Sequence, residues 1–98
     1  MAEAPRPLGD AELESALARA PGWTRAADGA LFLRRRLPSA AAAVGFVAAV
    51  GALAERHGHH PELRWVYRDV ELRLLTHDAG DVVTERDAAL MLAIAELL

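Results

Sequence analysis

The sequence contains no cysteine and no lysine, and only 5% of its residues are aromatic. Without cysteine the chain cannot be a disulfide-stabilised scaffold, use a thiol nucleophile or build a cysteine zinc site. All 11 basic residues are arginine, against 14 acidic residues, and the formal net charge is −3. A mildly acidic chain whose one basic cluster is residues 34–36 is a poor candidate for a nucleic-acid partner, and we expect none.

With 98 residues, the chain has room for one small domain. A composition of 53% hydrophobic and 26% charged residues is globular, and the abundance of alanine and arginine is typical of a bacterial coding bias. The proline-rich start predicts a flexible tail over residues 1–9 and a domain over residues 10–98. This start lacks the apolar segment of a secretory signal, so we expect a cytoplasmic protein.

Residues 37–54 carry no charge, and this run reaches the lower length limit of a membrane-spanning helix. Alanine and glycine dominate the run, so we expect a helix without membrane insertion. Phe46, Val50 and Leu53 form an apolar stripe at helical spacing, whereas the opposite face consists of small uncharged residues. We expect another subunit to cover that second face, giving a homodimer or homotetramer. Burial of both faces within one domain is the alternative.

Capping signals predict three helices. Asp10 is expected to be the N-cap of a first helix that ends before Pro21. Ser39 is the candidate N-cap of the long uncharged helix, which ends near residue 55. Thr84 is a good N-cap for a last helix that reaches Leu98.

Turn signals and alternation predict two β-hairpins. The first joins residues 23–25 to residues 30–37 through the turn at Asp28-Gly29, because glycine supplies the positive φ of a tight turn. The second joins residues 63–67 to residues 70–76, where apolar and polar residues alternate. The element order α-β-β-α-β-β-α predicts an α+β fold: a four-stranded antiparallel sheet with three helices packed on one face.

Four histidines are the candidates for chemistry: His57, His59, His60 and His77. Histidine titrates near neutral pH, so such a cluster suits proton transfer or metal binding. The cluster lacks the i, i+4 histidine pair with a nearby glutamate that is typical of catalytic zinc helices, and we expect no metal site. For His57 we favour capping of the long helix, since a cationic histidine stabilises a helix carboxyl end.

The spacing around the other three histidines is more specific than the cluster itself. The pattern is Glu55-x-x-x-His59-His60-Pro61, five residues to Tyr67, nine to His77 and nine more to Asp87. With Gly22-Trp23 and the Asp28-Gly29 turn, this pattern resembles the pterin-4a-carbinolamine dehydratase family over about residues 10–98. The resemblance implies a hydro-lyase that dehydrates 4a-hydroxy-tetrahydropterin to quinonoid dihydropterin in tetrahydropterin recycling. It also implies that no cofactor is needed.

By match to the family motif, His59 and His77 are the general acid and base candidates. His60 would position the pterin and could assist catalysis. Glu55 would orient a histidine or bind the amino group of the pterin ring, and Pro61 would fix the turn that presents the histidine pair.

Two further positions of the resemblance have competing structural interpretations. Trp23 could line the pterin pocket or belong to the core. Thr84-x-x-Asp87 is a capping-box signature, so we favour a structural role for Thr84 and Asp87 although the family motif includes the aspartate. The loop after His77 departs from the family pattern, because Gly80-Asp81-Val82-Val83 has one residue more. This could alter the pocket rim and substrate affinity.

Two other functions stay open. Animal members of this family also serve as dimerisation partners of a transcription factor, so the chain could be a non-catalytic regulatory or dimerisation module. It could also bind a different pterin without dehydrating it. Substitution of His59 and His77 distinguishes these functions, because an enzyme would lose its activity whereas a protein-binding module would keep its complex.

Overall fold

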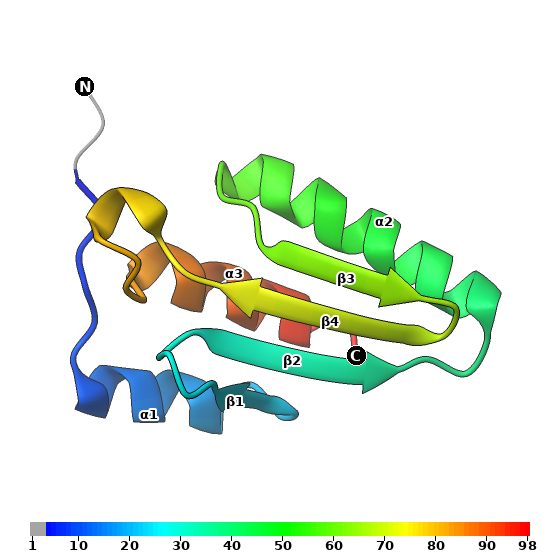
Figure 1. Ribbon diagram of the computed structural model, residues 1–98, viewed down its shortest axis with the longest axis horizontal. Coiled ribbons are helices and arrows are strands. Elements are labelled where there is room, and N and C mark those ends of the chain that lie inside the picture. Colours follow the sequence, from blue (N-terminus) through cyan, green and yellow to red (C-terminus); the bar gives the residue numbers. More distant parts are fainter. Residues whose placement is uncertain (1–3) are drawn as a thin grey trace.

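The computed structural model describes residues 4–98, so residues 1–3 of the expected tail lie outside the described range. Two β-hairpins build one sheet, with β1 at Trp23–Arg25, β2 at Leu31–Arg36, β3 at Glu62–Val66 and β4 at Asp69–Leu74. The strands lie in the order β1-β2-β4-β3, and every neighbouring pair is antiparallel. Helices α1 (Asp10–Ala18), α2 (Ala40–His57) and α3 (Glu85–Ala95) cover one face (Figure 1). The predicted α+β fold and element order are confirmed.

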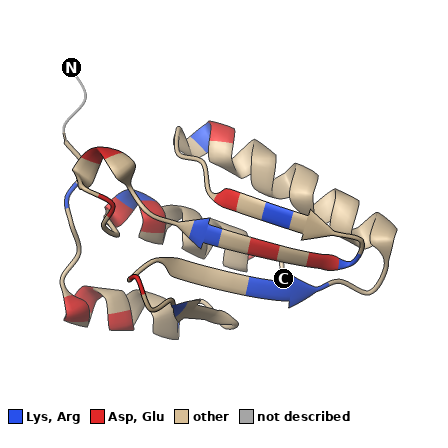
Figure 2. Cartoon of the chain, viewed as in Figure 1, with Lys and Arg blue, Asp and Glu red and all other residues tan. Residues whose placement is uncertain are grey.

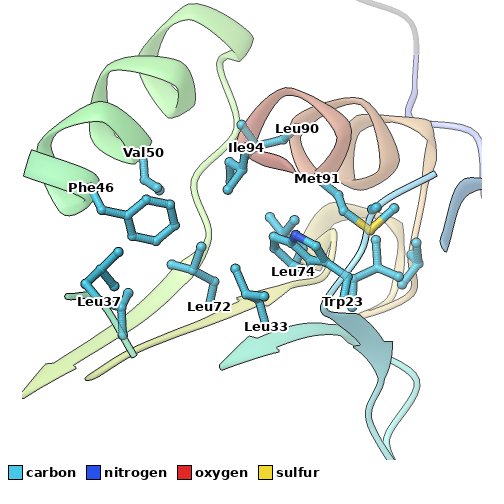
Figure 3. Packing of buried hydrophobic residues seen from close by; sticks show 14 of the residues in the cluster. Trp23, Leu33, Leu37, Phe46, Val50, Leu72, Leu74, Leu90, Met91 and Ile94 are labelled. Atoms are coloured by element: carbon cyan, nitrogen blue, oxygen red, sulfur yellow. The ribbon is translucent and has the colours of Figure 1, made fainter. Parts of the chain in front are cut away.

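The core lies between the sheet and the three helices. The inward side chains of the central strands, such as Leu33 and Leu72, are paired across β2 and β4. Phe46 and Val50 from α2 and Ile94 from α3 pack onto them (Figure 3). Burying these side chains is the main favourable contribution to folding, at about 25 cal/mol for each Å² of apolar surface.

The opposite face of the sheet has no helix over it and carries charged side chains. Arg34 and Arg64 flank Glu71, at 2.9 and 4.0 Å, and Arg73 pairs with both Glu62 and Asp28. Figure 2 shows these charges along the strands, whereas α2 is uncharged until its last turns. Alternation of buried apolar and exposed charged residues is expected where an antiparallel sheet is covered on one face only.

Helix α2 is 18 residues long and apolar enough to meet the length and composition criterion of a membrane span. Its inner face is nevertheless in the core, because Ala43, Phe46, Val50 and Ala54 are buried. Ser39 caps it as predicted, since the Ser39 hydroxyl accepts the Ala42 N–H at 3.0 Å. One such helix is weak support for a membrane location, because core helices pass the same criterion.

The element ends differ from the predicted ones by a few residues. The prediction that Asp10 is an N-cap was wrong: Gly9 is the N-cap, and the Asp10 carboxylate pairs with Arg25 at 3.2 Å. Helix α3 ends at Ala95 rather than at Leu98. Within the tail expected over residues 1–9, the Leu8 N–H donates to the Val83 carbonyl and the Arg6 carbonyl accepts from Glu85 N–H. The described end of the tail therefore runs beside the segment that leads into α3.

Candidate active site

A cleft forms where the chain leaves α2 and where it leaves β4, and it brings two of the predicted histidines together. Its volume is about 160 Å³. Ligand pockets are usually about 300–1,000 Å³, so this cleft can hold one reacting edge of a small molecule without enclosing it. A larger groove between α1 and α3, about 490 Å³, contains no histidine. The histidine cleft is lined by Gly58, His59, Leu75, Thr76, His77, Asp78 and Arg86.

His59 enters the cleft because α2 ends at His57, two residues earlier, and Gly58 caps the helix. Gly58 has φ +61° and ψ +32°, a left-handed conformation that glycine adopts without a steric penalty. The Gly58 N–H donates to the Glu55 carbonyl and the His59 N–H donates to the Ala54 carbonyl. These bonds close the helix end and fix the backbone that carries the imidazole. The His59 side chain is 11% exposed.

Asp87 in the first turn of α3 holds this imidazole. Its Oδ1 lies 2.5 Å from His59 Nε2, although the two residues are 28 positions apart in the sequence. The other oxygen, Oδ2, accepts hydrogen bonds from the Thr76 hydroxyl at 2.7 Å and the Thr84 N–H at 2.8 Å. The Asp87 side chain is completely buried. The capping box predicted for Thr84 and Asp87 is confirmed, and the same carboxylate also binds a histidine.

The contacts of Asp87 determine which nitrogen of neutral His59 carries its proton. Oδ2 already accepts two hydrogen bonds, and an ionised carboxylate can only accept, so Nε2 must be the donor toward Oδ1. The lone pair of neutral His59 is then on Nδ1, which can accept a proton from a ligand.

His77 also lines the cleft, from the 3-10 turn His77–Ala79 that follows β4. Its Nδ1 lies 2.5 Å from Asp81 Oδ1. The side chains of His77 and Asp81 are 70% and 68% exposed, in contrast to the buried pair of His59 and Asp87. The Asp81 carboxylate raises the pKa of His77, because it accepts a hydrogen bond from the imidazolium and attracts its charge.

The remaining residues of the predicted site lie outside the cleft lining. His60 and Glu55 form an exposed pair, with 2.8 Å between Nε2 and Oε2. Pro61 is half-buried between His60 and the start of β3. Trp23 lies in the core beside Leu33, Leu74 and Met91 (Figure 3). It does not line the cleft, so the core interpretation of Trp23 fits the structure.

The sequence did not point to Thr76 or to the contact between Asp81 and His77. A buried threonine at the end of a strand carries no sequence signal of a site. Asp81 follows His77 by four residues, but this spacing has meaning only in a known backbone conformation. Within residues 4–98, no group of three histidine, aspartate or glutamate side chains is close enough together to hold a metal ion.

Comparison with known proteins points to a single family. Residues 6–97 match the sequence profile described as "Pterin 4 alpha carbinolamine dehydratase". A protein of Chloroflexus aggregans is 42% identical over 91 residues, covering 93% of this chain and 96% of the relative. A protein of Rhodopseudomonas palustris is 45% identical over 89 residues, covering 89% and 86%. Both are named "Putative pterin-4-alpha-carbinolamine dehydratase".

Two solved structures share the fold. A crystal structure from Brucella melitensis, described as a transcriptional coactivator/pterin dehydratase, aligns with a TM-score of 0.81 and 32% identity. It covers 92% of this chain and 99% of that one. A pterin dehydratase-like protein described as a RuBisCO assembly factor in the alpha-carboxysome aligns with a TM-score of 0.65 and 25% identity, covering 81% and 92%.

Proposed function

The chain belongs to the pterin 4 alpha carbinolamine dehydratase family, and we propose that it dehydrates 4a-hydroxy-tetrahydropterin to quinonoid dihydropterin and water. The observation that carries this proposal is the meeting of His59 and His77 on one cleft, each with one ring nitrogen held by a carboxylate. The reaction needs one proton delivered and one removed, and two imidazoles can do both near neutral pH.

The different surroundings of the two histidines suggest their roles. Asp81 raises the pKa of His77, so His77 remains protonated to higher pH and suits the general acid. Neutral His59 presents the lone pair of Nδ1 and suits the general base. The C4a–O bond of the substrate breaks as His77 protonates the leaving hydroxyl. His59 accepts the proton of N5, and the N–H electron pair forms the C=N bond.

The exposed residues next to the cleft are proposed to contact the rest of the substrate. His60 and Glu55 present polar groups outside the cleft lining, where a pterin ring larger than the cleft would extend. Their proposed roles are substrate positioning and, for Glu55, orientation of His60. The proposed setting is tetrahydropterin recycling in the cytoplasm, where this dehydration would follow a pterin-dependent hydroxylation.

The exposed apolar surface supports the proposal of a homodimer or homotetramer. The edge strand β3 carries Leu63 and Trp65, which are 40% and 43% exposed although they are on the sheet face that the helices cover. On α2, Val44 is 51% exposed among alanines and glycines. An apolar strand at the edge of a sheet and an apolar helix face are both surfaces that proteins usually cover.

A second candidate function is a protein-binding or regulatory role on the same scaffold. The descriptions of the two structural relatives favour it, since one is called a transcriptional coactivator/pterin dehydratase and the other a RuBisCO assembly factor. Such a role would use the outer face of α2 rather than the histidines.

An assay of quinonoid dihydropterin formation tests the first candidate. The wild type is compared with His59→Ala and with Val44→Glu, a change on the outer face of α2 away from the cleft. We expect His59→Ala to lose about 10²–10⁴-fold in rate. A folded wild type that does not accelerate the reaction would refute the dehydratase and favour the binding role.

A further inference from the structure

The loop between β4 and α3 is built around two consecutive residues with left-handed backbone. Gly80 has φ +88° and Asp81 has φ +59°. The Gly80 N–H donates to the His77 carbonyl at 3.0 Å, and the Asp81 N–H donates to the Thr76 carbonyl at 3.2 Å. The loop closes where the Thr76 N–H donates to the Val82 carbonyl at 2.9 Å. These bonds turn the chain back so that the Asp81 side chain meets His77.

Aspartate at this position has to be explained, because the backbone itself favours glycine. A positive φ brings Cβ close to the following backbone in every residue with a side chain, and aspartate and asparagine tolerate it best among them. In the described chain, the polar partner of the Asp81 carboxylate is Nδ1 of His77. An exposed ion pair contributes little to stability, so the contact is better explained by its effect on the imidazole.

We propose that Asp81 is a positioning residue for His77. The Asp81 carboxylate binds Nδ1 of His77 and thereby makes Nε2 of His77 the nitrogen that exchanges a proton with the substrate. This inference rests on the proposed dehydratase function. Neutral His77 then keeps its proton on Nδ1, toward Asp81, and titrates at Nε2. In residues 4–98 no hydrogen bond uses Nε2 of His77.

The charged groups around His77 come from several elements. Asp81 and Asp78 belong to its own loop, and Glu62 begins β3. Arg86 from α3 and His59 from the end of α2 line the same cleft. Asp81 has the largest effect on the pKa of His77, whereas Glu62 and Asp78 raise it through space only. Removal of the Asp81 charge should therefore lower this pKa more than removal of the Asp78 charge.

The test is an NMR titration of the His77 ring in the full chain, with the resonance assigned by its loss in His77→Gln. Asp81→Asn keeps the side-chain size and tolerance of positive φ, and Asp81→Gly removes the carboxylate without backbone strain. Asp78→Asn is the matched control, because it removes a neighbouring carboxylate that does not bond the ring. We expect the His77 pKa to fall in both Asp81 variants, and to fall less in Asp78→Asn.

The pH dependence of the dehydration rate supplies the second measurement. In Asp81→Asn the loss of activity at alkaline pH should begin at lower pH. For each pH unit by which the profile is displaced, the dehydration rate at a fixed alkaline pH should fall about tenfold. An unchanged His77 pKa in both Asp81 variants would overturn the inference, as would a displaced pKa without displacement of the rate profile. A wild type without dehydratase activity would refute the proposed function but not the pairing of His77 with Asp81. The NMR titration tests that pairing without any measurement of dehydration.

Discussion

Asp87→Asn is the substitution that best separates the structural role of Asp87 from its effect on His59. In the wild type, Oδ2 accepts from the Thr84 N–H and the Thr76 hydroxyl, and Oδ1 faces His59 Nε2. The asparagine carbonyl can take the place of Oδ2 and keep the cap, which puts the NH₂ group toward Nε2. Nε2 must then accept, so neutral His59 carries its proton on Nδ1 and loses the lone pair proposed to act as base.

The magnitudes follow from these contacts. Asp87→Ala removes the cap and leaves buried donors without acceptors, which should lower the free energy of unfolding by about 3–5 kcal/mol. Asp87→Asn keeps most of the hydrogen bonds and should cost about 1–2 kcal/mol. Its dehydration rate should nevertheless fall by about 10²–10⁴-fold, as for loss of the base itself.

Urea denaturation measures the stability of both Asp87 variants, and the dehydration assay measures their rates. Nitrogen-15 NMR of the His59 ring shows directly which nitrogen carries the proton. A folded Asp87→Asn protein with nearly wild-type activity, or with the proton of His59 still on Nε2, would refute the tautomer argument.

Four other predictions concern separate parts of the molecule. Val44→Glu puts a charge on the exposed face of α2 and should reduce the oligomer mass measured by light scattering, whereas an unchanged mass would argue against an interface there. His60→Ala should raise KM more than it lowers kcat, since His60 is proposed to position the substrate; a loss confined to kcat would contradict this. Ile94→Ala leaves a core cavity and should cost about 2–5 kcal/mol in denaturant unfolding, with the cleft residues untouched. Addition of a chelator should leave the dehydration rate unchanged, and a loss restored by added metal would overturn the metal-free account.

The asymmetry between the two histidine pairs is the main feature of the site. The pair of His59 and Asp87 is shielded from solvent, so its hydrogen bond is part of the folded core and should resist salt. The pair of His77 and Asp81 is exposed, so its electrostatic part should weaken as ionic strength rises. Because the raised pKa of His77 depends on Asp81, protonation of His77 favours the folded state below its ordinary pKa. That contribution is lost as the pH rises through the raised value.

Local signals in the sequence predicted most of the fold. The Asp28-Gly29 turn, the Ser39 cap and the alternation over β4 each depend on residues within a few positions of one another. The predicted boundaries were less accurate, because helix ends depend on backbone contacts made after folding. Asp10 has the composition of an N-cap, but it begins α1 and pairs with Arg25 from β1 instead.

The site could be predicted only in part for the same reason. The family pattern singled out His59, His77 and Asp87, and the structure places His59 and His77 on one cleft with Asp87 against His59. No local rule, however, places Asp87 beside His59 across 28 positions, so the capping role was visible and the histidine contact was not. The bond from Asp81 to His77 depends on the left-handed backbone at residues 80 and 81.

The most direct test of the dehydratase proposal is the formation of quinonoid dihydropterin from chemically generated 4a-hydroxy-tetrahydropterin, followed with chelator present. The wild type is measured beside His59→Ala and His77→Ala, each checked for folding. The proposal predicts that the wild type accelerates dehydration over buffer and that each substitution removes most of this acceleration. A folded wild type that gives the buffer rate, or a folded single variant that keeps the wild-type rate, would contradict it.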